Sequence, residues 1–136
     1  MRQQHHTVYI VDDDDDVRDS LRALLESYNF TVRDFSSGSD FLIARRKGDG
    51  DCLLLDLHMP QLDGISVLVQ MRAEGSELPA IVITGRSDPA LKQRALQNGA
   101  FALFDKPVPE DVLLNAIDCA IASRAMDSHS SGGRIS

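Results

Sequence analysis

The sequence predicts an α/β fold built on a parallel five-stranded sheet flanked by five helices. Two observations support this prediction. Five short apolar runs alternate along the chain with five segments of helical pattern, the order from which parallel sheets are built. Two of these runs, 53–55 and 80–83, are continuously apolar, as expected of strands buried on both faces. With 136 residues, the chain has the length of one domain.

The strands and helices are expected to alternate strictly. The strands are expected at 7–11, 31–35, 52–56, 80–84 and 101–104. The helices are expected at 17–28, through 41–44, at 65–71, at 89–97 and from residue 109 onward. Asp14–Asp16 would lie at the start of the first helix, where carboxylates cap free amides. The second strand carries Arg33 and Asp34 in its middle, which favours an edge of the sheet.

Polar side chains stand where four of the predicted strands end. Asp12 follows the first strand, Asp56 and Thr84 end the third and fourth, and Lys106 follows the fifth. Ligands of open α/β sheets gather at the carboxyl ends of the strands, and parallel strands all end on the same side. We therefore expect these four residues to lie close together.

These residue types point to phosphoryl chemistry. A carboxylate such as Asp56 can attack a phosphoryl group and form an acyl phosphate. Asp12 or Asp13, together with Asp56, would offer the oxygen ligands that Mg²⁺ prefers. Lys106 would offset phosphoryl charge, and the Thr84 hydroxyl would donate a hydrogen bond to a phosphoryl oxygen. Solvated acids, a structural threonine and a surface lysine are the alternatives for each residue taken alone.

Five short motifs give the chain a recognisable resemblance over residues 7 to about 124. They are Ile10–Asp13, Leu55–Pro60, Asp63-Gly64, Ile83–Gly85 and Lys106-Pro107. In this order and at this spacing they resemble the response-regulator receiver domain of two-component signalling, which has the CheY-like fold. The resemblance implies a strand order of 2-1-3-4-5. It also implies a surface of helix 4, strand 5 and helix 5 that signals onward.

The resemblance further implies the role of each site residue. Asp56 would accept a phosphoryl group from a histidine kinase or a phosphotransfer protein, with Thr84 and Lys106 in contact with that group. Mg²⁺, or Mn²⁺ in its place, would be held by Asp12, Asp13, Asp56 and the backbone carbonyl of His58. The Lys106–Pro107 bond is usually cis in the family, and phosphorylation often forms a homodimer.

Three further positions are expected to set the response. The side chains of His58 and Arg86, each two residues beyond a site residue, are expected to tune the lifetime of the phosphoryl group. Leu103 stands where many receivers have a Tyr or Phe that rotates inward on activation. Because leucine has no ring to swing, signalling by aromatic rotation is not expected here, whereas a shift of the loop after Thr84 is.

Composition limits the partners and the location. The net charge of −7 at pH 7 disfavours direct binding to nucleic acid. The chain shows no signal peptide and no apolar run of membrane-spanning length, so we expect a cytoplasmic protein without membrane contact. Cys52 and Cys119 lack metal-ligand spacing and are expected to be buried thiols. We expect flexible termini at 1–6 and 125–136, the latter a tail or a linker.

Two other functions compete with a phosphorylated switch that turns over no external metabolite. A haloacid-dehalogenase-like phosphatase also uses a strand-end aspartate, a later Thr and a Lys, but the chain is short for one. A degenerate receiver would be an interaction module without phosphorylation. The first helix and Ile83–Gly85 also resemble receivers of transcription factors with a C-terminal helix-turn-helix, so an effector domain beyond Ser136 is a further expectation.

Overall fold

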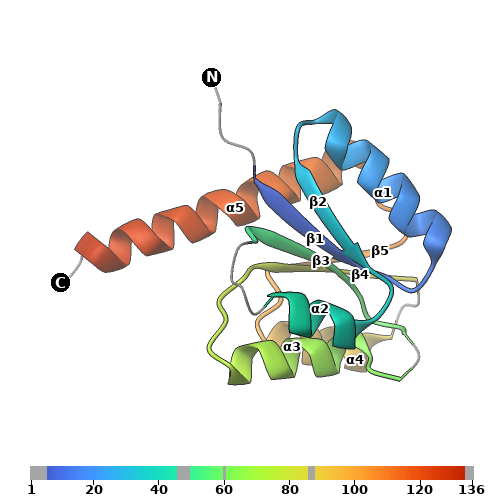
Figure 1. The fold of residues 1–136 in the computed structure, drawn as a ribbon. Coiled ribbons are helices and arrows are strands. Elements are labelled where there is room, and N and C mark those ends of the chain that lie inside the picture. The colour runs from blue at the N-terminus through green and yellow to red at the C-terminus, as the bar shows by residue number, and fades with distance from the viewer. Residues whose placement is uncertain (1–5, 46–49, 60, 86–87, 134–136) are drawn as a thin grey trace.

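The protein forms the α/β fold that the sequence predicts. The computed structural model describes residues 6–45, 50–59, 61–85 and 88–133. The five strands are all parallel and are ordered β2-β1-β3-β4-β5, so β2 is an edge strand as its two central charges indicate (Figure 1). The strands are β1 (Thr7–Val11), β2 (Thr31–Phe35), β3 (Cys52–Asp56), β4 (Ala80–Thr84) and β5 (Ala102–Asp105). The helices are α1 (Asp15–Ser27), α2 (Gly38–Ala44), α3 (Gly64–Ala73), α4 (Pro89–Gln97) and α5 (Glu110–Gly133).

The helices cover the two faces of the sheet in two groups. Figure 1 shows α1 and α5 on one face and α2, α3 and α4 on the other. Strand residues alternate between the two faces, so each face has its own apolar cluster. Leu53 and Leu55 of β3 join the cluster beneath α2 and α3, and Leu54 joins the one beneath α1 and α5. The central strand β3 is buried along its whole length, which explains its run of leucines.

Aspartate and serine side chains start four of the helices. The carboxylates of Asp14, Asp63 and Asp88 and the hydroxyl of Ser37 each accept from free amides of the first turn of α1, α3, α4 and α2, respectively. Such caps satisfy donors that have no partner within the helix. The cap at Asp14 confirms that the later part of the acidic run begins α1.

Some details differ from the sequence-based expectation. Helix α5 continues to Gly133, beyond the tail boundary expected near residue 124, and the chain holds neither proline nor glycine between 110 and 131 to stop it. Cys52 is buried as expected, whereas Cys119 is exposed, because it lies on the outer side of α5. No helix among the described residues has the length and apolar character needed to span a bilayer.

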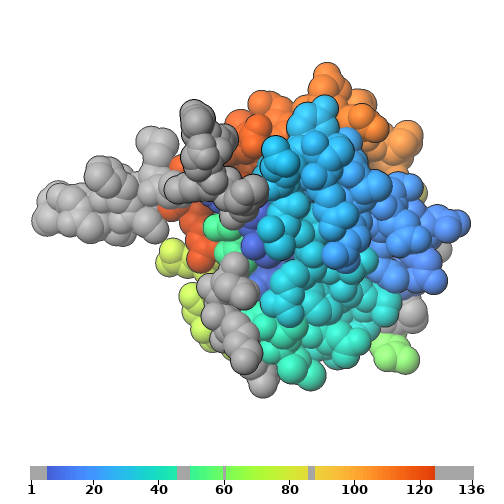
Figure 2. Space-filling model, turned by 45° about the horizontal axis from the view of Figure 1, so that its top comes forward, coloured from blue at the N-terminus to red at the C-terminus, as the bar shows by residue number. Residues whose placement is uncertain are grey.

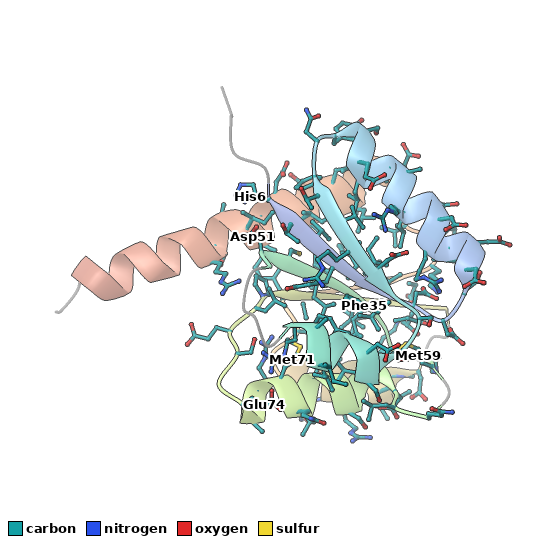
Figure 3. All side chains as sticks on the ribbon, viewed as in Figure 1. His6, Phe35, Asp51, Met59, Met71 and Glu74 are labelled. Atoms are coloured by element: carbon teal, nitrogen blue, oxygen red, sulfur yellow. The ribbon has the colours of Figure 1, made fainter. Side chains whose placement is uncertain are left out.

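The two ends of the sheet have different roles. His6 and Asp51 lie together at the amino ends of β1 and β3, whereas Phe35 and Met59 lie at the opposite end (Figure 3). At the amino end, the Arg124 guanidinium donates to the Gly50 carbonyl over 2.8 Å and ties α5 to the turn before β3. These contacts close the amino end of the sheet, and the polar residues predicted to lie together are at the opposite, carboxyl end of the strands.

Gly64 is a close-approach point between α3 and β3, and its substitution should destabilise the fold. A Cβ atom at Gly64 would lie 2.5 Å from the Asp56 carbonyl oxygen and 2.8 Å from the Leu57 Cα. We expect Gly64→Ala to lower the free energy of unfolding by about 2 kcal/mol, because rigid backbone must shift. Urea unfolding measures this. Gly85→Ala is the control, since its Cβ would lie 3.7 Å from the nearest side-chain atom, and equal losses in both variants would contradict the prediction.

Candidate functional site

The carboxyl ends of the strands bring the predicted polar residues to one edge of the sheet. Asp56 is the last residue of β3 and Thr84 the last of β4, while Asp12 and Lys106 directly follow β1 and β5. Asp12, Asp56 and Thr84 are all buried, with 6% or less of their surface exposed. Buried polar side chains at the ends of neighbouring strands are costly unless they are paired, so their placement here marks a site.

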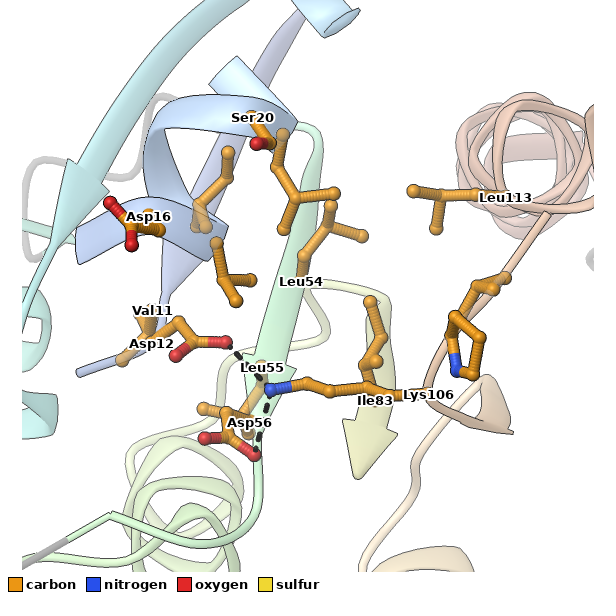
Figure 4. A pocket seen from close by; sticks show the side chains of 15 residues that line it. Val11, Asp12, Asp16, Ser20, Leu54, Leu55, Asp56, Ile83, Lys106 and Leu113 are labelled. Carbon is orange, nitrogen blue, oxygen red and sulfur yellow. Dashed lines mark hydrogen bonds and ion pairs between the residues drawn. The ribbon is translucent and has the colours of Figure 1, made fainter. Parts of the chain in front are cut away.

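Lys106 reaches across the sheet toward both buried carboxylates. Its Nζ lies 3.2 Å from Asp12 Oδ2 and 3.9 Å from Asp56 Oδ1 (Figure 4). The Lys106 backbone N–H donates to the Thr84 carbonyl over 2.8 Å, which fixes the start of this side chain beside β4. The Lys106–Pro107 peptide bond is cis. A single ammonium group thus faces two carboxylates that come from distant parts of the chain.

Three carboxylates form a compact oxygen cluster. One oxygen from each of Asp12, Asp13 and Asp56 lies within 4.8 Å of the other two. Asp12 and Asp56 are buried, whereas Asp13 is exposed. Hard carboxylate oxygens at the edge of solvent suit Mg²⁺ or Mn²⁺, which keep several waters and take one or two carboxylates. The donor set therefore fits the expected cation.

Burial and neighbouring charge make Asp56 an unusual carboxyl group. Burial, together with the negative charges of Asp12 and Asp13, raises the pKa of Asp56 to about 6, against the opposite effects of Lys106 and of the His58 amide. The His58 N–H donates to Asp56 Oδ1 over 3.3 Å. Additional positive charge at the cluster would favour the ionised carboxylate that a nucleophile requires.

The remaining aspartates of the acidic run have structural roles. The Asp14 N–H donates to Asp12 Oδ1 over 2.9 Å, and the Asp14 side chain caps α1. Asp15 and Asp16 are exposed in the first turn of α1, where the helix dipole favours negative charge. The run thus divides into two residues that face the cluster and three that begin the helix.

The structure describes two of the three residues that are expected to set the response. The His58 side chain is half-buried and lines a cavity with Asp63 and Leu91, beside the cluster. Arg86 lies outside the described residues. Leu103 pairs with Val82 in the sheet and packs against the apolar cluster that contains Leu53 and Leu55. Phe104 faces the opposite side of the sheet. A half-buried aliphatic side chain therefore occupies the position that is aromatic in many receivers.

Two features of the site escaped the sequence analysis. A cavity of about 410 Å³ opens beside Asp12, Asp56 and Lys106. Its deeper walls are apolar and come from α1, the central strands and the start of α5 (Figure 4). Arg18 of α1 contacts the backbone of Asp12, six residues earlier. Both depend on how α1 packs against the sheet, and only the nearness of Arg18 to Asp12 in the sequence could have indicated the second.

Comparison with known families agrees with this geometry. The family model described as "Response regulator receiver domain" matches residues 8–118, which is most of the chain. The chain belongs to this family. Receiver domains are signalling domains of two-component systems, and they bind Mg²⁺ at an acidic pocket; the described residues of this chain include an acidic cluster of Asp12, Asp13 and Asp56. The family match gives no support to the alternative of a phosphatase.

Individual relatives show how much of a longer protein this receiver domain matches. The response regulator protein TodT of Pseudomonas putida is 35% identical over 136 residues, which are 100% of this chain and 60% of TodT. The transcriptional regulatory protein FixJ of Bradyrhizobium diazoefficiens is 39% identical over 114 residues, which are 84% of this chain and 56% of FixJ. The receiver domain thus spans little more than half the length of these relatives.

Solved structures share the fold of this receiver domain. The response regulator StyR superposes with a TM-score of 0.86 at 36% identity, and the match covers 95% of this chain and 65% of that chain. The structure titled FixJ-N superposes with a TM-score of 0.80 at 34% identity over 88% of this chain and 96% of that chain. These matches confirm the CheY-like strand order.

The raised pKa of Asp56 predicts a pH-dependent gain in stability when its charge is removed. Above pH 6 the folded protein must hold an ionised Asp56, whereas below pH 3.8 the group is neutral in both the folded and the unfolded state. The cost of Asp56 to stability therefore grows as the pH rises from about 3.8 to about 6 and is complete above that. In EDTA, we expect Asp56→Asn to gain about 3 kcal/mol at pH 7.5 and about half of that at pH 5.

Chemical unfolding at the two pH values measures this gain. Asp118→Asn, which removes an exposed carboxylate of α5, is the matched control. A gain for Asp56→Asn that is the same at both pH values would show that the charge of Asp56 is not the cause.

Proposed function

We propose that Asp56 is the phosphoryl acceptor of this receiver domain. The observation that carries the proposal is a buried carboxylate at the end of β3 that faces the Lys106 ammonium 3.9 Å away and shares an oxygen cluster with Asp12 and Asp13. The donor is a phosphohistidine of a histidine kinase or of a phosphotransfer protein. Kinases and phosphotransfer proteins of this kind are the partners of the family.

The transfer is a displacement at phosphorus. A carboxylate oxygen of Asp56 forms a bond to phosphorus while the P–N bond of the donor breaks, and the imidazole nitrogen leaves with the electron pair. The Lys106 ammonium offsets the charge of the phosphoryl oxygens, and the Thr84 hydroxyl donates a hydrogen bond to one of them. Hydrolysis of the acyl phosphate returns the free carboxylate, so the domain catalyses only its own phosphorylation and dephosphorylation.

A divalent cation completes the site. Asp12, Asp13, Asp56 and the backbone carbonyl of His58 would hold Mg²⁺ or Mn²⁺. When bound, the cation neutralises the carboxylates and the phosphoryl oxygens that must approach one another. The side chains of His58 and Arg86 remain the candidates for setting the lifetime of the acyl phosphate.

The output surface is formed by α4, β5 and α5. Leu96 on α4, Phe101 before β5 and Val112 on α5 are large apolar side chains with about 40% or more of their surface exposed. We propose that phosphorylation alters this surface through the loop after Thr84 and favours a homodimer. Because Leu103 has no ring, the change does not require an aromatic side chain to rotate.

The relatives suggest the wider setting of the receiver domain. FixJ and TdiR are named transcriptional regulatory proteins. We propose that this domain likewise controls a transcription factor in the cytoplasm, with DNA binding left to an effector domain of the helix-turn-helix type. The acidic surface charge of the chain, −7 overall, fits a role that involves a kinase rather than DNA.

Phosphorylation by a small phosphodonor tests the proposal. With acetyl phosphate and Mg²⁺, we expect mass spectrometry to show the addition of one phosphoryl group to the wild type, and none to Asp56→Asn. Asp13→Asn should slow labelling by about tenfold or more, because the cation loses a ligand. Asp118→Asn should be labelled like the wild type. Absence of labelling in the wild type would favour a degenerate receiver.

Mg²⁺ should stabilise the receiver domain by relieving the repulsion within its carboxylate cluster. At ten times its Kd, Mg²⁺ should add about 1.4 kcal/mol to the free energy of unfolding. The melting temperature would then rise by about 4 °C. Thermal melts with MgCl₂, against NaCl at equal ionic strength, measure the shift. Asp13→Asn should lose most of it, and equal melting temperatures of the wild type in the two salts would contradict a cation site.

A further inference from the structure

Arg18 links α1, the end of β1 and the edge strand β2. Its Nη1 donates to the Asp12 carbonyl over 2.9 Å, and its Nη2 donates to Asp15 Oδ1 over 2.7 Å. Its Nε lies 3.4 Å from Asp34 Oδ2. The Arg18 side chain is only 15% exposed, so water competes little for its contacts with the Asp12 carbonyl and Asp34, whereas Asp15 is 80% exposed. The guanidinium fork thus meets one backbone oxygen and two carboxylates on three segments.

Both backbone groups of Asp12 are held in place. Its N–H donates to the Phe35 carbonyl of β2 over 3.2 Å, and its carbonyl accepts from Arg18. Asp12 lies directly after β1, so the regular hydrogen-bond ladder ends at this point. The contact with Arg18 therefore fixes the peptide plane that joins Asp12 to Asp13.

The orientation of this peptide matters because it sets the positions of two of the three clustered carboxylates, those of Asp12 and Asp13. Asp12 and Asp13 occupy the short segment between β1 and the cap of α1, and Asp13 is exposed. Their carboxylates must approach Asp56 against mutual repulsion. A segment without strand or helix ladder keeps such a geometry only if other groups hold it.

An anchored partner makes Arg18 rigid. Asp34 also accepts from Arg22 Nη1 over 2.8 Å, so the β2 carboxylate is held by two arginines. Arg22 in turn donates to Glu26 on the next turn of α1. Figure 2 shows α1 (blue) lying along the surface beside the segment that contains β2 (cyan). The positions of Arg18 and Arg22 therefore depend on the packing of α1 against the edge of the sheet.

We propose that Arg18 is a positioning residue for the cation site: it holds the Asp12 carbonyl so that Asp12 and Asp13 present their carboxylates to Asp56. The inference rests on the proposed Mg²⁺ site and names a residue outside the ligand set. The fork geometry is essential, because a lysine offers a single ammonium centre and cannot meet three separated acceptors in fixed directions.

The sign of the effect separates positioning from simple electrostatics. Removing a positive charge near a carboxylate cluster should by itself strengthen cation binding. If Arg18 positions the ligands, Arg18→Gln should instead weaken Mg²⁺ binding by about tenfold, as expected when a residue that orients metal ligands is lost. Arg22→Gln is the matched control, since it also removes an arginine side chain that pairs with the Asp34 carboxylate.

Calorimetric or amide chemical-shift titration with MgCl₂ measures the affinities of the folded proteins. We expect Arg22→Gln to change the Kd for Mg²⁺ less than twofold. Arg18→Lys should still bind Mg²⁺ weakly, since a lysine restores the charge but not the fork of the guanidinium group. In EDTA, the Asp14 amide, which donates to Asp12 Oδ1, should exchange with solvent faster in Arg18→Gln than in Arg22→Gln.

Each failure has its own meaning. Equal or tighter Mg²⁺ binding by Arg18→Gln, or full recovery in Arg18→Lys, would overturn the positioning role while the wild type still binds Mg²⁺ and is phosphorylated. A wild type that binds no Mg²⁺ would instead overturn the proposed cation site, and with it this inference.

Discussion

Electrostatic repulsion among three carboxylates is the constraint on which the site depends. Asp12, Asp13 and Asp56 bring oxygens within 4.8 Å of one another, and two of these side chains are buried. Burial, and after it the charge of the neighbouring carboxylates, raises the pKa of Asp56 to about 6. The cluster persists because Asp56 ends the central strand β3, and because the Asp12 backbone is held by Phe35 and Arg18. Repulsion stored in this way is what a bound cation relieves.

Positive charge reaches the cluster from two sides and by two routes. Lys106 arrives from the end of β5 and faces the carboxylate oxygens of Asp12 and Asp56 directly. Arg18 arrives from α1 and holds the Asp12 backbone instead. Under the proposed function, the first contact would give way to a phosphoryl group, and the second would keep the cation ligands in place. Such a division would let Asp56 be phosphorylated while the segment that carries Asp12 and Asp13 keeps its geometry.

The proposed signal would need a different physical basis from that in receivers with an aromatic switch. Leu103 lies on the strand that leads to Lys106 and is half-buried against the apolar cluster beneath α2 and α3. Thr84 is buried at the end of the neighbouring strand and accepts the Lys106 amide through its carbonyl. If Asp56 is phosphorylated as proposed, this backbone contact would carry the change to β5 without the rotation of a ring.

The amino-acid sequence by itself determined the strands, most helix limits and the four polar residues at the strand ends. It could do so because apolar runs, caps and strand direction are local properties, and parallel strands share one carboxyl edge. The bond from Arg18 to the Asp12 carbonyl, the pairing of Arg18 with Asp34, the exposure of Cys119 and the cavity beside Asp56 were decided only in the tertiary structure. These features depend on how α1 and α5 are rotated and seated against the sheet, and residues far apart in the chain set that packing.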